Sequence, residues 1–177
     1  EVAQLRPLST SYTPYQPERS QGTLVTHWIY QCVLSALTGF EAINTSLYDR
    51  SAAIFEAVCC ARRSRKRSGD VLLAQSLFEE DISFLSTHAK GTDLRFQFSP
   101  LDPVTGRLDY NRLELFLKDN HADISAFVFP QLNGLGLLED VDRLSDLSSS
   151  FESYADDYML FEVNSTSYLS TKNCWVL

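Results

Sequence analysis

The sequence is poor in the residues that build metal centres and disulfide frameworks. It has four cysteines among 177 residues, at positions 32, 59, 60 and 174, and no two of them have the C-x-x-C spacing of a zinc or redox motif. The three histidines, at positions 27, 88 and 121, are far apart, and a helix face, a helix end and a loop explain them. We therefore predict no metal site, and this cysteine usage favours a reducing compartment.

Other absences exclude further classes of protein. No G-x-S-x-G nucleophile elbow occurs, and no glycine-rich phosphate loop follows an apolar run, which disfavours a serine hydrolase and a nucleotide-binding fold. No apolar stretch is long enough to span a membrane. A net charge of −8 argues against nucleic acid or an anionic membrane as a partner. One basic run, RRSRKR at residues 62–67, is expected to solvate the end of a helix, with phosphate or RNA contact as the alternative.

The most distinctive stretch that is present is YTPYQPERSQG, residues 12–22. Pro14 and Pro17 fix their own backbone angles and hold the residues before them in extended geometry. A rigid segment that carries two tyrosines, two glutamines and a glutamate is suited to contact another molecule. The alternative is a rigid surface turn that leads into a helix.

A helical pattern follows this segment. Ser20 can cap a helix that runs to about residue 37, and Gly39 can end it. Its apolar residues recur at helical spacing and form one stripe: Val25, Trp28, Ile29, Cys32, Val33 and Ala36. After a turn at residues 44–48, Asp49 opens a second helix to about residue 63.

Residues 41–177 alternate between strand and helix patterns. Strands are predicted at residues 41–43, 71–75, 94–98, 124–129, 158–163 and 168–177, and helices at residues 79–89, 109–118 and 139–151. Such alternation predicts an α/β fold, a three-layer αβα arrangement around a mostly parallel sheet. We expect one unit over residues 1–177, complete or truncated, with residues 1–11 as a lead-in. Ligands of such sheets gather in the loops at the carboxyl ends of the strands, here residues 44–49, 75–79, 130–136 and 164–167.

YTPYQPERSQGTL and the later LTGFEAINTSLYD resemble the N-terminal half, or the separate subunit 1, of glycine dehydrogenase (decarboxylating), the P-protein of the glycine cleavage system. AKG at residues 89–91 and GLLED at residues 136–140 extend the resemblance more weakly. It implies part of the large domain of the aspartate-aminotransferase-like, fold type I enzymes that use pyridoxal phosphate. It also implies four positions around the cofactor, which fall at Ser51, Phe78, Asn133 and Asn164.

As a set these positions are degenerate in this sequence: Asn133 matches the asparagine of the family's loop, but this one match cannot bind a cofactor unaided. Ser51 follows Arg50 where subunit 1 has a small-residue phosphate loop, Phe78 replaces a histidine, and Asn164 replaces the aspartate that pairs with the pyridine nitrogen. None of the lysines matches the Schiff-base lysine, whose site in the family lies beyond the end of this chain. The resemblance thus implies no catalytic residue and no cofactor bound by this chain, with pyridoxal phosphate expected on a partner subunit.

The resemblance implies a supporting role in glycine decarboxylation and in aminomethyl transfer to the lipoyl H-protein. The expected partner is a lysine-bearing subunit 2 or a second copy of the chain, with the H-protein as a further partner. Tyr12, Tyr15, Gln16 and Glu18 are the expected contact residues at the partner or substrate interface. The alternative function is a degenerate pseudoenzyme that acts as a scaffold or regulatory module. The expected compartment is the cytoplasm in a bacterium and the mitochondrial matrix in a eukaryote.

Overall fold

A computed structural model describes residues 4, 15–38, 43–45, 47–65, 69–120, 123–152, 159–163 and 169–170. The chain divides into two compact units, residues 1–46 and residues 47–177, which we call the N-terminal unit and the C-terminal unit. The boundary falls inside the turn predicted at residues 44–48. The structure thus has two units within the range 1–177 that was expected to form one.

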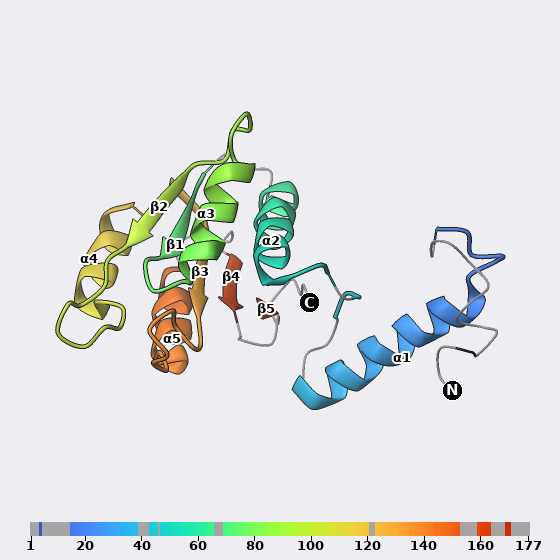
Figure 1. The fold of residues 1–177 in the computed structure, drawn as a ribbon. Helices are drawn as coiled ribbons and strands as arrows, with labels where there is room; N and C mark the ends of the chain where they lie inside the picture. Colours follow the sequence, from blue (N-terminus) through green and yellow to red (C-terminus); the bar gives the residue numbers. More distant parts are fainter. Residues whose placement is uncertain are drawn as a thin grey trace. The chain divides into compact units, whose positions relative to one another are not determined.

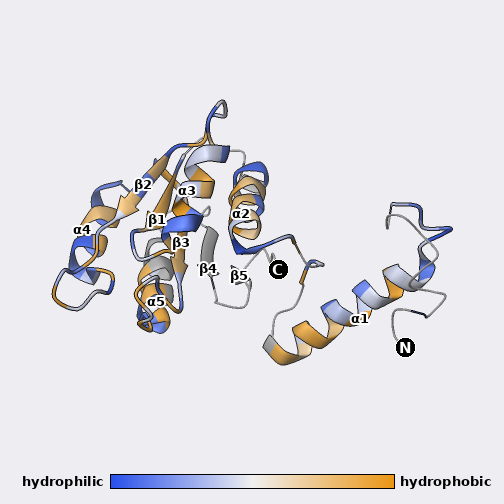
Figure 2. Cartoon of the chain, viewed as in Figure 1, coloured by the Kyte–Doolittle hydropathy of each residue, from blue (hydrophilic) through white to orange (hydrophobic). Residues whose placement is uncertain are grey.

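The N-terminal unit contains helix α1, Gln21–Thr38, which confirms the predicted helix. Ser20 stands before its first residue, but its hydroxyl donates to the carbonyl of Gln16 at 2.7 Å and so closes the preceding turn. The predicted apolar stripe is on the exposed side of the helix, where Trp28 is 68% exposed. Figure 2 shows apolar residues along much of α1.

The C-terminal unit is built on a sheet with the strand order β2-β1-β3-β4-β5 (Figure 1). The strands are β1 Asp70–Ala74, β2 Phe96–Ser99, β3 Ile124–Pro130, β4 Met159–Val163 and β5 Leu169–Ser170. The first four strands are mutually parallel and β5 is antiparallel to β4, which confirms a mostly parallel sheet. Of the strand predicted at residues 168–177, only β5 is within the described residues, and Ile43, from the strand predicted at residues 41–43, is not in a strand.

Four helices cover the two faces of this sheet (Figure 1). They are α2 Arg50–Arg65, α3 Glu79–His88, α4 Tyr110–Asn120 and α5 Val141–Glu152. Helix α2 packs beside α3, and α4 beside α5. The crossovers β1-α3-β2 and β2-α4-β3 run in opposite directions along the sheet, so right-handed connections place α3 and α4 on opposite faces. The predicted three-layer arrangement is confirmed.

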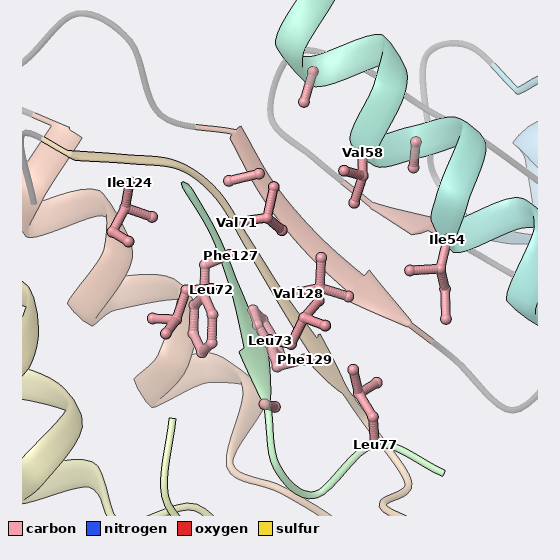
Figure 3. Close-up of a cluster of buried hydrophobic side chains, with 14 of the residues drawn as sticks. Ile54, Val58, Val71, Leu72, Leu73, Leu77, Ile124, Phe127, Val128 and Phe129 are labelled. Atoms are coloured by element: carbon pink, nitrogen blue, oxygen red, sulfur yellow. The ribbon is translucent and has the colours of Figure 1, made fainter. Parts of the chain in front are cut away.

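The core lies where α2 meets the central strands (Figure 3). All seven residues of β3 are buried, as are the last four of β1, because helices cover both faces of the sheet. Ile54 and Val58 of α2 are fully buried in this cluster. Asp49 caps α2 by accepting a hydrogen bond from the Ala52 amide at 2.8 Å, as the sequence predicts.

Candidate functional site

The strand order places a switch point between β1 and β3. The chain leaves β1 towards one edge of the sheet and leaves β3 towards the other, and ligands of open α/β sheets bind beside the carboxyl ends of such strands. Here the two loops that follow these strands, residues 75–78 and 131–140, touch directly. The amide of Gly134 donates to the carbonyl of Ser76 at 2.8 Å. A Cβ atom on Gly134 would lie 3.1 Å from the carbonyl oxygen of Leu77, so only glycine fits without displacing backbone.

Asn133 holds the second loop from the inside. Its side chain is fully buried, and its Oδ1 atom accepts hydrogen bonds from the amides of Leu135 and Leu137, both at 3.0 Å. Its Nδ2 atom donates to the carbonyl of Gly106 at 2.9 Å and to Oε1 of Glu139 at 3.0 Å. Both ends of the amide are therefore used inside the protein, and Asn133 acts as a positioning residue for the loop.

Glu139 and Tyr110 extend this network to α4. Glu139 is buried, and its Oε2 atom accepts from the amide of Leu108 at 3.2 Å and from the hydroxyl of Tyr110 at 3.3 Å. The same hydroxyl accepts from the amide of Asp140 at 2.9 Å. Burial raises the pKa of Tyr110; the Asp140 amide lowers it, and the charge of Glu139 raises it further. The proton on Tyr110 is thus held more tightly in the folded state than in the unfolded chain.

We expect Tyr110→Phe to destabilise the protein by about 1–2 kcal/mol at neutral pH, because Glu139 loses a donor and the Asp140 amide loses its acceptor. A raised folded pKa contributes stability that is present below about pH 10 and is lost as the pH rises through the folded value. The stability difference between wild type and variant should therefore shrink above about pH 10. Urea denaturation across this pH range measures it.

Tyr48→Phe is the matched control, since Tyr48 is fully exposed. Its stability should equal that of the wild type at every pH. A Tyr110→Phe protein whose deficit stays constant with pH would show that the hydroxyl does not hold its proton in this network.

A second polar cluster joins the start of α2 to the start of α3. Arg50 donates through Nε to Oδ2 of Asp81 at 2.7 Å, and the hydroxyl of Ser51 donates to Oδ1 of the same carboxylate at 2.5 Å. Asp81 is 1% exposed. The Arg50 guanidinium also lies over the ring of Phe78, with its carbon 3.9 Å from the ring centroid, a cation–π arrangement. Two positions named by the resemblance, Ser51 and Phe78, are thus brought together around Arg50.

The other predicted contact residues have different surroundings. Asn133 lies in its own hydrogen-bonded cage, and Asn164 and Tyr12 lie outside the described residues. Tyr15 is 88% exposed, and Gln16 and Glu18 are also exposed, as a contact segment requires. Of the loop predicted at residues 44–49, the described residues do not follow a described strand, and residues 47–49 lead into the start of α2.

Sequence reasoning missed Asp81, Glu139 and Tyr110. Asp81 belongs to the run Glu79-Glu80-Asp81, which the sequence explains fully as an acidic first turn of a helix, and α3 does begin there. Glu139 also lies near a helix start, two residues before α5 begins at Val141. The available signal was only that a carboxylate lies near the end of each switch-point loop, Asp81 shortly after the first and Glu139 within the second. This does not distinguish a solvated side chain from a buried one.

His88 and Arg62 have structural explanations. Within the described ranges, no group of three or more histidine, cysteine and acidic side chains could hold a metal ion. His88 stacks on Phe84, with ring centroids 3.8 Å apart. Arg62, the first residue of the basic run, forms a bidentate pair with Asp93 at 2.8 and 2.7 Å. None of the helices that the structure describes is both long and apolar enough to cross a membrane.

The fold and its paired loops define part of the large domain of fold type I pyridoxal-phosphate enzymes. Residues of mouse CSAD superpose with a TM-score of 0.66 at 16% identity, over 91% of this chain and 35% of that one. The cysteine desulfurase of Thermococcus onnurineus NA1 superposes with a TM-score of 0.60 at 13% identity, over 92% and 41%. At these identities the likeness concerns the fold alone.

The family is defined by closer matches. The family model of the glycine cleavage system P-protein matches residues 3–159. The probable glycine dehydrogenase (decarboxylating) subunit 1 of Nitrosomonas europaea is 36% identical over 146 residues, 82% of this chain and 32% of the relative. The subunit 1 protein of Francisella tularensis is 39% identical over 139 residues, 77% and 30%. A crystal structure of glycine decarboxylase (P-protein) in inhibitor-bound form has a TM-score of 0.73 at 29% identity, over 92% and 34%.

The chain belongs to the glycine cleavage system P-protein family. It spans about a third of the length of the curated relatives that it matches. The recognition from YTPYQPERSQGTL and LTGFEAINTSLYD is confirmed, and so is the fold class that it implied.

The described side chains at the family's cofactor positions are engaged within the chain itself. The Ser51 hydroxyl and the Arg50 guanidinium, the groups available for a phosphate, both bind the buried carboxylate of Asp81. One face of the Phe78 ring is covered by Arg50. Asn133 has no exposed surface.

Proposed function

We propose that this chain is a non-catalytic, subunit-1-like portion of glycine dehydrogenase (decarboxylating). It supports a partner subunit that carries pyridoxal phosphate and decarboxylates glycine, and the partner passes the aminomethyl group to the lipoyl arm of the H-protein. The chain itself binds no cofactor. The observation that carries this proposal is the capture of Arg50 and Ser51 by Asp81, together with membership in a family whose relatives are named subunit 1.

The N-terminal unit supplies the contact surface in this proposal. The exposed side of α1 carries Val25, Trp28, Ile29 and Val33, each more than half exposed, and α1 contains no charged Asp, Glu, Lys or Arg residue. A contiguous apolar surface of this kind favours protein–protein contact. Tyr15 and Glu18 lie just before this helix and add polar groups to its end. We assign subunit 2 to this surface because the relatives belong to a two-subunit enzyme.

A scaffold or regulatory pseudoenzyme is the second candidate function. The cluster of Arg50, Ser51 and Asp81 favours this function, because polar groups that bind one another within the chain need no partner to complete them. The two candidates differ in one measurable property. Only the first requires the chain to raise the activity of a lysine-bearing subunit.

The test is co-expression of this chain with a glycine dehydrogenase (decarboxylating) subunit 2. We expect the two to co-purify, and we expect the release of labelled carbon dioxide from carboxyl-labelled glycine to need both subunits, cofactor and H-protein. The chain alone should release none. Binding to subunit 2 without any gain in activity would support the scaffold instead, and no binding would contradict the proposed partner.

Tyr15→Ala is expected to weaken association with subunit 2 by about tenfold, an ordinary loss for an interface tyrosine. The midpoint of thermal unfolding should not change, because the side chain is 88% exposed. Tyr12→Ala tests the other tyrosine of the motif in the same way. Leu115→Ala is the control, an exposed apolar residue on α4 outside the proposed surface, and should leave association unchanged. If either tyrosine variant lowered the free energy of unfolding by several kcal/mol, the replaced tyrosine would be a core residue and not a contact residue.

A further inference from the structure

The start of α2 has the features of an anion site. The carboxylate of Asp49, just before the helix, already accepts from the amide of Ala52. The side chains of Arg50 and Ser51, the first two residues of the helix, are the further groups at this end that favour negative charge. The anion that these groups bind in the structure belongs to the protein itself. It is the carboxylate of Asp81, which lies 30 residues after Ser51 in the chain and in the first turn of α3.

The Asp81 carboxylate uses both oxygen atoms in this position. Oδ2 accepts from Arg50 at 2.7 Å and Oδ1 from Ser51 at 2.5 Å, while 1% of the residue remains exposed. Glu80 adds a weaker contact to Arg50, with 3.4 Å between Oε1 and Nη2, from a side chain that is 74% exposed. The carboxylate therefore occupies the two groups that would otherwise face a ligand, and the exposed Glu80 contributes less.

We propose that Asp81 is the built-in occupant of an anion site at the start of α2, and that it closes this site to inorganic phosphate and phosphate monoesters. The inference deepens the proposed function, since it names the residue that keeps a phosphate-bearing cofactor off this chain. It can fail separately, because it concerns anion binding by the chain alone and makes no use of subunit 2.

The repulsion between the Asp81 carboxylate and a phosphate gives the expected size of the effect on phosphate binding. A second unit charge about 4 Å from the carboxylate would be repelled by a factor of about 6 in water and about 1000 at an effective dielectric constant of about 20. Asp81→Asn removes this repulsion, keeps the shape of the side chain and leaves its oxygen for Ser51. It also releases Arg50, because a side-chain amide nitrogen cannot accept a hydrogen bond.

The experiment is a titration of the full chain with inorganic phosphate. Calorimetry measures the affinity, and the midpoint of thermal unfolding is measured at each phosphate concentration. Asp81→Asn should bind phosphate at least about tenfold more tightly than the wild type, and its unfolding midpoint should rise with phosphate while that of the wild type stays constant. Glu80→Gln is the matched control, because it removes the same charge from the exposed neighbour, and it should gain no binding. Adding Arg50→Met to Asp81→Asn should abolish the gain.

Three results would overturn the inference. The first is a folded Asp81→Asn protein that binds phosphate no better than the wild type, which would make Asp81 only a tie between α2 and α3. The second is a wild type that already binds phosphate through Arg50. Asp81→Ser provides a smaller second variant if Asp81→Asn is unstable. The third result is that neither variant folds even in concentrated phosphate, in which case Asp81 is required for packing and the inference fails.

Discussion

Replacing Asn133 with alanine should destabilise the C-terminal unit by about 3–5 kcal/mol, the range expected when a buried hydrogen-bonded network loses its central member. The variant leaves the amides of Leu135 and Leu137 without their acceptor and removes one donor from the buried carboxylate of Glu139. The cost is high because desolvated groups are left unpaired. Urea denaturation at neutral pH, monitored by circular dichroism, measures it.

Asn111→Ala is the matched control, since it is the same replacement at an exposed position on α4. It should change the free energy of unfolding by less than about 0.5 kcal/mol. If Asn133→Ala were as mild as Asn111→Ala, the loop after β3 would not depend on this amide. The side chain would then be available for the ligand contact that the resemblance implies.

The order of strands and helices in the C-terminal unit was predictable from the sequence. The strand predicted at residues 124–129 is observed as β3, Ile124–Pro130. Asp49 and Asp109 stand at the predicted starts of two helices, and each accepts a hydrogen bond from the amide three residues later. These features depend on neighbours in the chain, so local patterns are enough to predict them.

The contacts within the candidate site were not predictable in the same way. The resemblance selected Ser51, Phe78 and Asn133 by position, but what each one touches depends on residues 30, 28 and 6 positions away: Asp81, Arg50 and Glu139. A single sequence gives no measure of which carboxylate is buried, and an acidic residue beside a helix start is ordinary when solvated. The network around Asn133 therefore has no sequence signal beyond its glycine-rich loop.

Helix α1 shows most clearly which features local sequence patterns predict and which they do not. Its length and its apolar stripe follow from spacing alone, and both are confirmed. Spacing does not say which side is covered, and here the side that carries His27, Gln31 and Leu34 is the less exposed one. Ser20 is buried and Gln31 donates to the carbonyl of Ile43, while the stripe remains exposed.

The double replacement Trp28→Ala with Ile29→Ala should weaken association with subunit 2 by about 30-fold to about 1000-fold, which corresponds to about 2–4 kcal/mol. Trp28 and Ile29 are 68% and 54% exposed, so their truncation leaves no cavity inside the chain. Alanine is also the best helix former, so α1 itself should persist. Association measured by calorimetry against subunit 2, with circular dichroism of the free chain, tests both statements.

His27→Ala is the control on the same helix, because His27 lies beside these residues in the chain but on the more covered side. It should leave association unchanged, since a residue outside the exposed stripe makes no contact with the partner in this proposal. Equal weakening by His27→Ala and by the double replacement would mean that the whole helix, and not its apolar side, sets the affinity. Unchanged association in the double variant would remove α1 from the interface and leave YTPYQPE as the proposed contact. A large effect confined to the double variant would instead explain why an uncharged helix presents its apolar side outward: the partner supplies the apolar surroundings that this side requires.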